Sequence, residues 1–330
     1  MPANLPPAYF AAEQKYRSAK GSAQKVAALQ QMLSATPKHK GTDHLRADLR
    51  SKLARATEEL ENPKRSGGAN QYQPYAIRKE GAGQAVLIGL PNAGKSQLMA
   101  ALTGASAKVG DYPFTTQAPL PGMLRYQNVL IQLVDTPAIN DNDVQTRLFS
   151  LLRNSDLLLI VVDLSGDPLS EAKEVMDELD RWGYRLLCNG QEPDPEDPRV
   201  QKHALLVGNK ADLPEADEAF EMLQELYGDR FTVVPASAAD DGLSAALGKA
   251  IFLGLRRTRV YLKAPGGKPD YQSPLIVETG SSLEEAAHSL HKEWARKVKY
   301  ALLWGSGKFD GQRVGRDYIL RDEDVIELHG

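Results

Sequence analysis

Short apolar runs alternate with amphipathic stretches through the middle of the chain. Each run has the length of a buried strand and is bounded by turn residues, which predicts five strands. They are residues 85–90, 129–134, 157–164, 204–207 and 232–234. Strands that alternate with helices predict an α/β fold with a mostly parallel, doubly wound sheet.

The flanking regions follow other patterns. Before the strands, apolar residues recur every three to four positions and predict three helices, followed by a linker rich in Gly and Pro. The helices are residues 9–20, 23–35 and 42–61, and the linker is 62–68. We therefore expect a helical N-terminal region at 1–66 and a central α/β domain at 67–257.

After residue 257 the pattern predicts a small α+β domain at 258–330. Its expected strands are residues 260–263, 275–278, 300–304 and 325–328, and its expected helix is 283–298. We expect Tyr300, Trp304 and Trp294 mainly to fill the core of this domain, with a recognition surface as the alternative.

Composition favours a globular protein of the cytoplasm. Hydrophobic and charged residues make up 42% and 25% of the chain, no apolar run reaches the length of a membrane span, and the start lacks the apolar core of a signal peptide. The single cysteine, Cys188, cannot form an internal disulfide and is expected to be structural. We expect no membrane partner.

The net charge of −3 is unevenly distributed along the chain. Residues 1–66 contain 12 Lys and Arg against 6 Asp and Glu, whereas residues 67–257 contain 17 against 26. A basic region suits an anionic partner such as RNA, although a solvated helix surface gives similar counts. The candidate RNA contacts are Lys38, Lys40, Arg46, Arg50, Lys52 and Arg55.

A glycine-rich motif with chemistry of its own follows the first predicted strand. Residues 89–96 read G-L-P-N-A-G-K-S, which fits the P-loop pattern G-x-x-x-x-G-K-[ST] in its required place between a strand and a helix. Backbone N–H groups of such a loop surround phosphates, Lys95 would meet the β and γ phosphates, and Ser96 would bind Mg²⁺. The expected nucleotide contacts here are Gly89, Pro91, Asn92, Ala93, Gly94, Lys95, Ser96 and Gln97.

A second motif selects the base. Asn209, Lys210 and Asp212 form N-K-x-D directly after a predicted strand. The Asp212 carboxylate can accept from both N1–H and the 2-amino group of guanine, and adenine offers neither donor. Lys210 would lay its methylene stem along the base. After the last strand, Ser237 and Ala238 are placed to present backbone amides to the guanine O6.

Two further segments are expected to sense the γ-phosphate. Asp135 ends a strand, where its carboxylate can reach Mg²⁺ through water, and Thr116 lies in a loop between the P-loop and Asp135, with Thr115 as the alternative ligand. Each element alone is ordinary turn chemistry. Together they occur in the order of a GTPase at the carboxyl ends of predicted strands, where open α/β sheets bind ligands.

The chain resembles the Obg-like, translation-factor-related GTPases, and most closely the developmentally regulated GTP-binding family with its C-terminal TGS domain. Residues 89–96, 112–116, 135–137 and 209–212 carry the resemblance in the central domain, and residues 259–270, 299–305 and 314–326 carry it in the tail. The resemblance implies a ubiquitin-like β-grasp for the tail, GTP hydrolysis with Mg²⁺, and a ribosome or RNA partner.

The sequence also departs from this family. Ala138 replaces the usual glycine of the third motif, although its N–H can still sense the γ-phosphate, and Ile139 stands where Ras-like GTPases place the glutamine that orients water. We therefore expect slow intrinsic hydrolysis, with Lys95, Thr116 and Asn92 as the catalytic residues. In related enzymes an asparagine at the position of Asn92 accompanies K⁺-stimulated hydrolysis, and we therefore hypothesise that K⁺ stimulates this chain. Family members often have serine there.

Only 45 residues separate Asp163 from Asn209, so the inserted domain of eukaryotic members is expected to be missing. The pattern suits a prokaryotic branch, and no dedicated protein partner can be identified. Two alternatives remain open: a ribosome-bound scaffold that holds GTP with little hydrolysis, and an ATP-dependent P-loop kinase.

Overall fold

The computed structural model describes residues 6–18, 22–37, 42, 46, 49–53, 75, 77–104, 118–139, 145–240, 242–291 and 296–330. Thr115, Thr116, Trp294, Lys38, Lys40 and Arg55 lie outside these residues. The chain divides into two compact units, Met1–Tyr72 and Gln73–Gly330.

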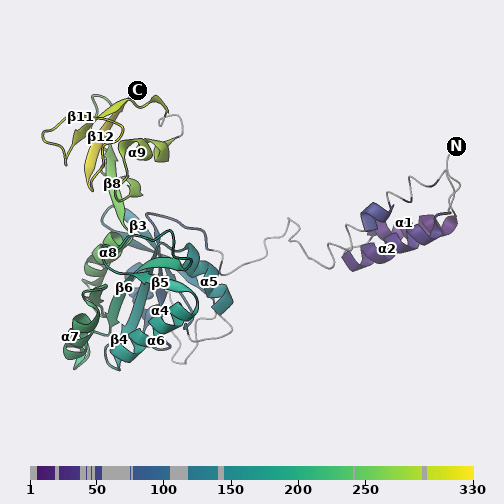
Figure 1. The fold of residues 1–330 in the computed structure, drawn as a ribbon, viewed down its shortest axis with the longest axis horizontal. Coiled ribbons are helices and arrows are strands. Elements are labelled where there is room, and N and C mark those ends of the chain that lie inside the picture. The colour runs from purple at the N-terminus through teal and green to yellow at the C-terminus, as the bar shows by residue number, and fades with distance from the viewer. Residues whose placement is uncertain are drawn as a thin grey trace. The chain divides into compact units, whose positions relative to one another are not determined.

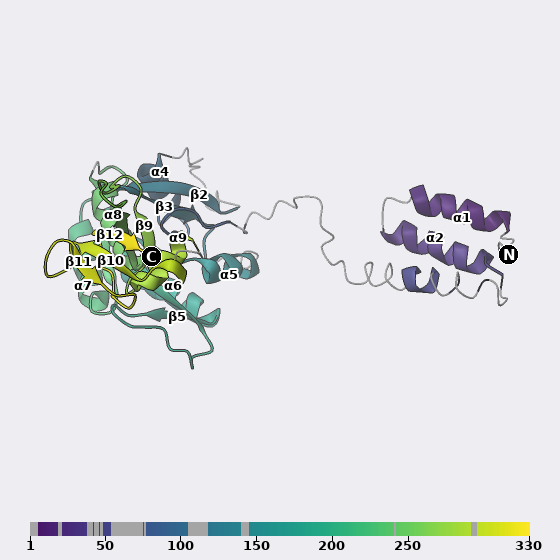
Figure 2. The same cartoon turned by 90° about the horizontal axis from the view of Figure 1, so that it is seen from above.

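The first unit contains two helices that lie side by side, α1 (Pro7–Ser18) and α2 (Ser22–Ala35) (Figure 2). Both were expected from the apolar spacing. They bury a small core with residues of a third helical segment at 49–53: Tyr9, Ala12, Leu29, Met32 and Leu49. The rest of the predicted helix at 42–61 lies largely outside the described residues.

The second unit begins with a seven-stranded sheet in the order β2-β3-β1-β4-β6-β5, with β7 also paired to β6. All pairs are parallel except β2 with β3, which are antiparallel. The strands are β1 (Gln84–Ile88), β2 (Leu120–Tyr126), β3 (Val129–Asp135), β4 (Leu157–Asp163), β5 (Tyr184–Leu187), β6 (Val200–Asn209) and β7 (Thr232–Pro235). The five predicted strands are confirmed, and β2 and β5 were missed.

Helices cover both faces of this sheet (Figure 1). On one face lie α5 (Gln145–Asn154), α6 (Pro168–Arg181) and α7 (Ala216–Tyr227), and on the other lie α4 (Lys95–Thr103) and α8 (Leu243–Gly254). Along β1, Val86 and Ile88 face the first set while Ala85 and Leu87 face the second, and all four are fully buried. A strand buried on both faces explains why the sequence reads as an unbroken apolar run.

A second sheet of five strands, in the order β11-β10-β12-β8-β9, follows. Its strands are β8 (Arg257–Leu262), β9 (Leu275–Glu278), β10 (Tyr300–Trp304), β11 (Gln312–Val314) and β12 (Asp324–His329). Helix α9 (Leu283–Leu290) packs on it and begins with a capping box between Ser282 and Glu285. This is the predicted β-grasp, although α9 ends sooner than expected because His291 adopts an extended backbone.

The expectation that Tyr300 and Trp304 fill the core of the C-terminal domain is wrong. Ala301 and Leu303, which alternate with them on β10, are the fully buried residues. Tyr300 instead stacks on His329 across the sheet, with ring centroids 4.8 Å apart, and the Trp304 ring lies under the Lys263 ammonium at 4.4 Å.

The central and C-terminal domains meet at the turn between β2 and β3. Asn128 Nδ2 donates to Tyr261 Oη and to the carbonyl of Tyr271, both at 2.9 Å. Arg259 Nη1 donates to Gln127 Oε1 in the same turn, and the Arg259 guanidinium lies over the Phe252 ring of α8. These contacts fix the C-terminal domain against the hairpin that ends at Asp135.

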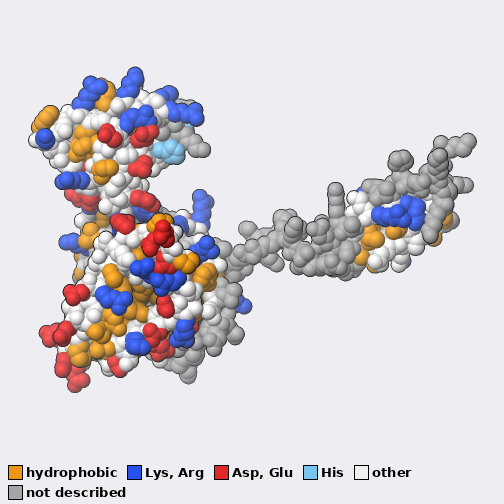
Figure 3. All heavy atoms as spheres, in the orientation of Figure 1, with side chains coloured by type: hydrophobic (Ala, Val, Ile, Leu, Met, Phe, Trp, Pro, Cys, Tyr) orange, Lys and Arg blue, Asp and Glu red, His pale blue; other side chains and the backbone are white. Residues whose placement is uncertain are grey.

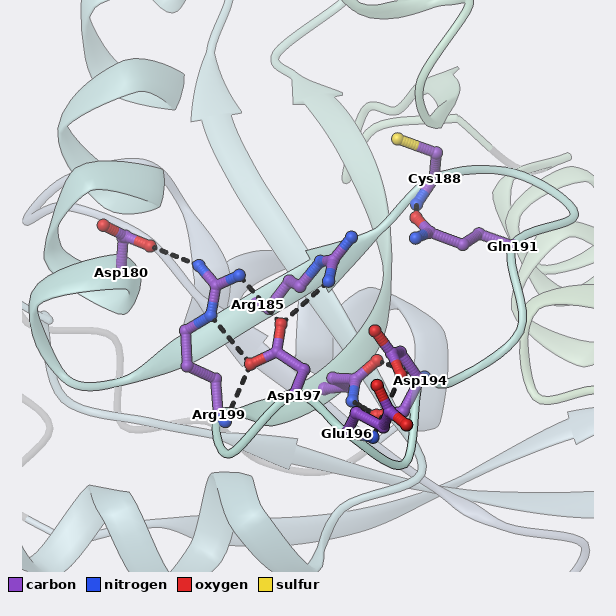
Figure 4. A network of polar contacts seen from close by, with 9 residues as sticks. Asp180, Arg185, Cys188, Gln191, Asp194, Glu196, Asp197 and Arg199 are labelled. Carbon is purple, nitrogen blue, oxygen red and sulfur yellow. Dashed lines mark hydrogen bonds and ion pairs between the residues drawn. The ribbon is translucent and has the colours of Figure 1, made fainter.

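The segment at 191–199 joins β5 to β6, and most of its residues are exposed. One carboxylate in it nevertheless has several partners: Asp197 accepts from Arg185 Nη1 at 2.8 Å and from Arg199 Nε and Nη2 at 3.0 and 2.8 Å (Figure 4). The side chain of Asp197 is only 6% exposed.

Charged side chains of both signs are interspersed over the face of the second unit drawn in Figure 3, with acidic groups gathered around α7. Among the described residues, no helix combines the length and the apolar character that crossing a membrane requires.

Candidate nucleotide-binding site

The predicted site residues of the central domain follow the carboxyl ends of its parallel strands. Strand β1 runs into Gly89, β3 ends at Asp135, β6 ends at Asn209, and β7 is followed by Ser237. Parallel strands bring these ends to one edge of the sheet. The sheet therefore assembles residues that lie far apart in the sequence.

Close packing explains both glycines of the P-loop. A Cβ added to Gly89 would lie 2.4 Å from the carbonyl oxygen of Val161, and one added to Gly94 would lie 2.2 Å from Asn209 Nδ2. Gly94 also has a φ of +83°, which disfavours any other residue. The loop can adopt this path only with glycine at both positions.

Lys95 is buried at the first turn of α4 and only 7% exposed. Its Nζ donates to the carbonyls of Gly89 at 3.0 Å and Leu90 at 2.8 Å. Burial lowers the pKa of Lys95 to about 8, against the attraction of Asp135 and Glu171. Two neutral carbonyls compensate an ammonium group poorly, so a phosphate would be a far better partner.

Ser96 and Asp135 provide the oxygen atoms expected for Mg²⁺. Ser96 Oγ donates to Asp135 Oδ2 at 2.5 Å, and Asp135 is 2% exposed. A hydroxyl and a carboxylate are hard oxygen ligands, which suit this ion. Among the described residues, no three His, Cys, Asp or Glu side chains cluster as a metal site. The fit is therefore to a magnesium ion that takes its other ligands from phosphates and water.

The segment after Asp135 is tied to the P-loop. Thr136 Oγ1 donates to the carbonyl of Leu87 at 2.6 Å. The backbone N–H of Ile139 donates to the carbonyl of Gly89 at 3.3 Å. The Ile139 side chain is 2% exposed and packs in the core with α5 and α6. Ala138 is 7% exposed.

The base-reading motif is held against the P-loop and the loop after β7. Asn209 Nδ2 donates to the carbonyl of Ala93 at 2.9 Å, and no partner for its buried Oδ1 exists among the described residues. Asp212 is exposed, and its Oδ1 accepts from Ser237 Oγ at 2.5 Å. Because this contact uses one carboxylate oxygen and the side chain is exposed, the group is oriented while remaining accessible to a ligand.

The remaining predicted contacts also lie on these loops. Asn92 is exposed with a φ of +65°, Pro91 is half-buried beside it, and Gln97 and Ala238 are exposed. Sequence reasoning missed an ion pair next to the base-reading motif, between the Lys210 ammonium and the Asp163 carboxylate. A signal for it existed, because Asp163 also ends an apolar run that forms a strand.

Comparisons with known proteins agree with this geometry. Residues 84–190 match the family described as "50S ribosome-binding GTPase", and residues 258–329 match the TGS domain. An uncharacterized GTP-binding protein of Methanocaldococcus jannaschii is 29% identical over 93% of each chain. Developmentally-regulated GTP-binding protein 1 of Xenopus laevis is 27% identical over 93% of this chain and 99% of its own.

The alignment to the archaeal relative spans 369 positions, more than the 330 residues of this chain, so that relative contains residues without a counterpart here. Among solved structures, the FeoB G-domain of Methanococcus jannaschii is 24% identical over 52% of this chain and 97% of its own, with a TM-score of 0.37. The P-loop, the base-reading motif and the two family matches agree: the chain is a P-loop GTPase with a C-terminal TGS domain, and its relatives over nearly their whole length include developmentally regulated GTP-binding proteins.

Proposed function

We propose that the protein is a guanine-nucleotide switch that hydrolyses GTP slowly and acts on the ribosome or another RNA in the cytoplasm. The observation that carries the proposal is the buried Lys95 ammonium beside the Ser96–Asp135 pair at the strand edge. This arrangement has the positive charge and the oxygen ligands that a nucleoside triphosphate with Mg²⁺ requires.

Each residue has a proposed role in binding. Lys95 holds the β and γ phosphates, and backbone N–H groups of the loop at Gly89, Pro91, Asn92, Ala93, Gly94 and Gln97 surround the phosphate chain. Asn209, Lys210 and Asp212 hold guanine, with backbone amides at Ser237 and Ala238 near O6. Ser96, Thr116 and Asp135 are the Mg²⁺ site, Asp135 through water. Bound there, Mg²⁺ neutralises charge on the β and γ phosphate oxygens.

Hydrolysis needs a water molecule whose oxygen attacks the γ-phosphorus while the bond to the β–γ bridging oxygen breaks, giving GDP and phosphate. Thr116 and the Ala138 N–H are the proposed sensors of the γ-phosphate. Because Ile139 is directed into the core, its side chain offers no group to orient the water, which supports a low intrinsic rate. Asn92 is an exposed residue of the phosphate loop itself, where its amide oxygen could bind K⁺.

Single-turnover hydrolysis of labelled GTP tests this reaction. We expect a slow rate in Na⁺, a rate roughly tenfold or more higher in K⁺ (about 1.4 kcal/mol per tenfold), and GTP preferred over ATP. The variant Asn92→Gly removes the amide and still tolerates the positive φ of this position, so it should lose K⁺ stimulation and keep GDP affinity. Equal rates in Na⁺ and K⁺ would remove the K⁺ hypothesis, and equal affinity for ATP would revive a kinase.

A scaffold that holds GTP with little hydrolysis is the second candidate, and the buried Ile139 favours it. Such a scaffold would show no acceleration by K⁺, ribosomes or both. The retained Lys95, Ser96 and Asp135 oppose it, since this set provides the charge stabilisation on which phosphoryl transfer depends.

The basic N-terminal region and the match to the family described as "50S ribosome-binding GTPase" support a ribosome partner. Arg46 is not a good contact, because its Nη1 donates to the carbonyl of Thr36 at 2.7 Å, whereas Arg50 and Lys52 are exposed. We therefore expect Arg50→Glu with Lys52→Glu to lower ribosome co-sedimentation and its salt dependence.

Exposed charges that lie elsewhere provide the control for this experiment. Reversal of Lys173 and Arg181 on α6 changes the net charge by the same amount without touching the basic region. An unchanged pellet for the Arg50 and Lys52 variant, or an equal loss for both variants, would count against a specific RNA contact.

A further inference from the structure

A pair of charged residues lies behind the base-reading motif. Strand β4 ends at Asp163 and β6 ends at Asn209, and these two residues are register partners in the sheet. Lys210, the next residue, directs its ammonium group onto Asp163 Oδ2. The side chains are 29% and 15% exposed, so the pair is largely shielded from water.

The Asp163 carboxylate is itself fixed on both oxygen atoms. Its Oδ1 accepts from the backbone N–H of Ser165 at 2.9 Å and from Ser165 Oγ at 2.6 Å, and its Oδ2 faces Lys210. The backbone N–H of Asp163 donates to Glu171 Oε2 at 2.9 Å. Burial opposes ionisation of Asp163, but the hydrogen bonds from Lys210 and Ser165 keep its pKa below the usual value.

The backbone around this pair is also tightly packed. Leu164 N–H donates to the carbonyl of Asn209 at 3.0 Å. A Cβ added to Gly208 would lie 2.9 Å from Leu164, so the two strand ends touch without room for a side chain. Lys210 has a φ of +64°, which sends its side chain in a direction that an ordinary backbone would not allow. Asp163 and Lys210 are therefore held in fixed positions relative to each other.

A lysine needs such an anchor if its stem is to serve as a flat surface for a base. The side chain has four rotatable bonds, and fixing it has an entropic cost because it loses its choice of rotamers. If the ammonium is already pinned in the free protein, part of this cost is met before the nucleotide arrives, and affinity rises.

We propose that Asp163 is a positioning residue for nucleotide binding, which pins the Lys210 ammonium so that the lysine stem lies where the purine base stacks. The inference rests on the proposed role of Lys210 in holding the base. Stacking on an aliphatic stem does not distinguish purines, whereas Asp212 reads the 2-amino group. Asp163 thus sets affinity, and Asp212 sets selectivity.

The test measures affinity of Asp163→Asn for GDP and for inosine diphosphate, which lacks only the 2-amino group of guanine. We expect both to bind roughly three- to tenfold more weakly, because the pinned lysine is lost, with the ratio between them unchanged. Asp163→Glu, which can restore the ion pair, should recover most of the affinity. A collapse of the site would instead change the ratio as well, because it would displace Asp212.

Two comparisons separate this role from general stability. Asp167→Asn makes the same chemical change at the N-cap of α6, where Asn caps nearly as well, and should leave both affinities unchanged. In a Lys210→Met background, which keeps an apolar stem and removes the ammonium, Asp163→Asn should cause no further loss.

Three results would overturn the inference: an Asp163→Asn protein with wild-type affinities, a loss that persists in the Lys210→Met background, or an altered ratio of the two nucleotides. Failure of the proposed function is a different result, since there the wild-type protein itself would not bind GDP.

Discussion

Two buried cations at different places in the second unit have opposite environments. Lys95 at the nucleotide edge is 7% exposed, and Arg259 at the junction of the two domains is 5% exposed. Burial lowers the pKa of Lys95 to about 8. The pKa of Arg259 is raised, chiefly by its hydrogen bonds to Asp322.

The difference lies in the partners. Lys95 donates to two neutral carbonyls, whereas Arg259 meets Asp322 Oδ2 at 2.5 Å and Glu323 Oε1 at 2.9 Å and also contacts Gln127. A buried charge with anionic partners supports the fold, and one that lacks them weakens the fold until a ligand provides the anion. The sheet edge is thus built to bind, and the junction is built to hold two domains together.

Lys95→Met gives the largest expected effect. The variant should bind GDP and GTP about a hundredfold more weakly or worse, since it loses charge-assisted hydrogen bonds worth about 1.5–3 kcal/mol each. Its thermal stability without nucleotide should stay the same or rise, because a poorly compensated buried charge is removed. Titration with a fluorescent guanine nucleotide and thermal unfolding measure the two properties.

A wild-type affinity in Lys95→Met would contradict the assignment of the phosphate site. Lys202→Met is the control, since it removes a half-buried lysine elsewhere in the domain, whose Nζ donates to the carbonyl of Arg153 at 2.7 Å. It should leave nucleotide affinity unchanged.

Arg259→Met should show the reverse behaviour. It leaves two carboxylates without their cation and removes the contact to Gln127, so we expect a loss of about 2 kcal/mol in the free energy of unfolding. This figure is below that of a fully buried pair because Asp322 and Glu323 are 41% and 62% exposed. Nucleotide affinity should not change. Urea unfolding and the same fluorescent titration provide the measurements.

The matched control is Arg313→Met, which removes an exposed arginine of the same domain that lies 3.9 Å from the Tyr300 ring centroid. It should change stability by less than about 1 kcal/mol. If Arg313→Met and Arg259→Met were equally destabilising, the junction would have no special role in holding the domains.

The sequence predicted the local parts of this contrast and missed the non-local ones. The P-loop and the N-K-x-D motif are short segments at strand ends, so residue type and order were enough to place Lys95 and Asp212. The contacts of Asp163 with Lys210 and of Arg259 with Gln127 join residues 47 and 132 positions apart. Only the sheet register and the docking of the domains create them.

The same reasoning explains the elements that were wrong or missed. Strand β2 contains Pro121 and Gly122, and β5 has only four residues, so neither forms a clear apolar run. In β10 the alternation of Tyr300 and Trp304 with Ala301 was misread because large aromatics suggested the core. The small Ala301 faces inward, and register sets which face is buried.

A third cation, the half-buried Lys202, gives the smallest effect and the sharpest test of the comparison. Burial lowers the pKa of Lys202 to about 8, as it does for Lys95, although Lys202 lies at the beginning of β6, away from the nucleotide edge. Its ammonium form is disfavoured in the folded protein, so between pH 8 and 10.5 the unfolded chain binds more protons than the folded one. In that interval stability should rise with pH.

Lys202→Met should therefore reduce this rise, with a gain in stability at pH 7 of about 1 kcal/mol after allowance for the partial exposure of the side chain. Urea unfolding at pH 7, 8 and 9 measures the slope for the variant and for the wild-type protein. An identical slope in both would mean that Lys202 does not titrate there. A reduced slope with unchanged GDP affinity would show that a lowered lysine pKa reports burial alone, and that position at the strand edge is what makes Lys95 a phosphate ligand.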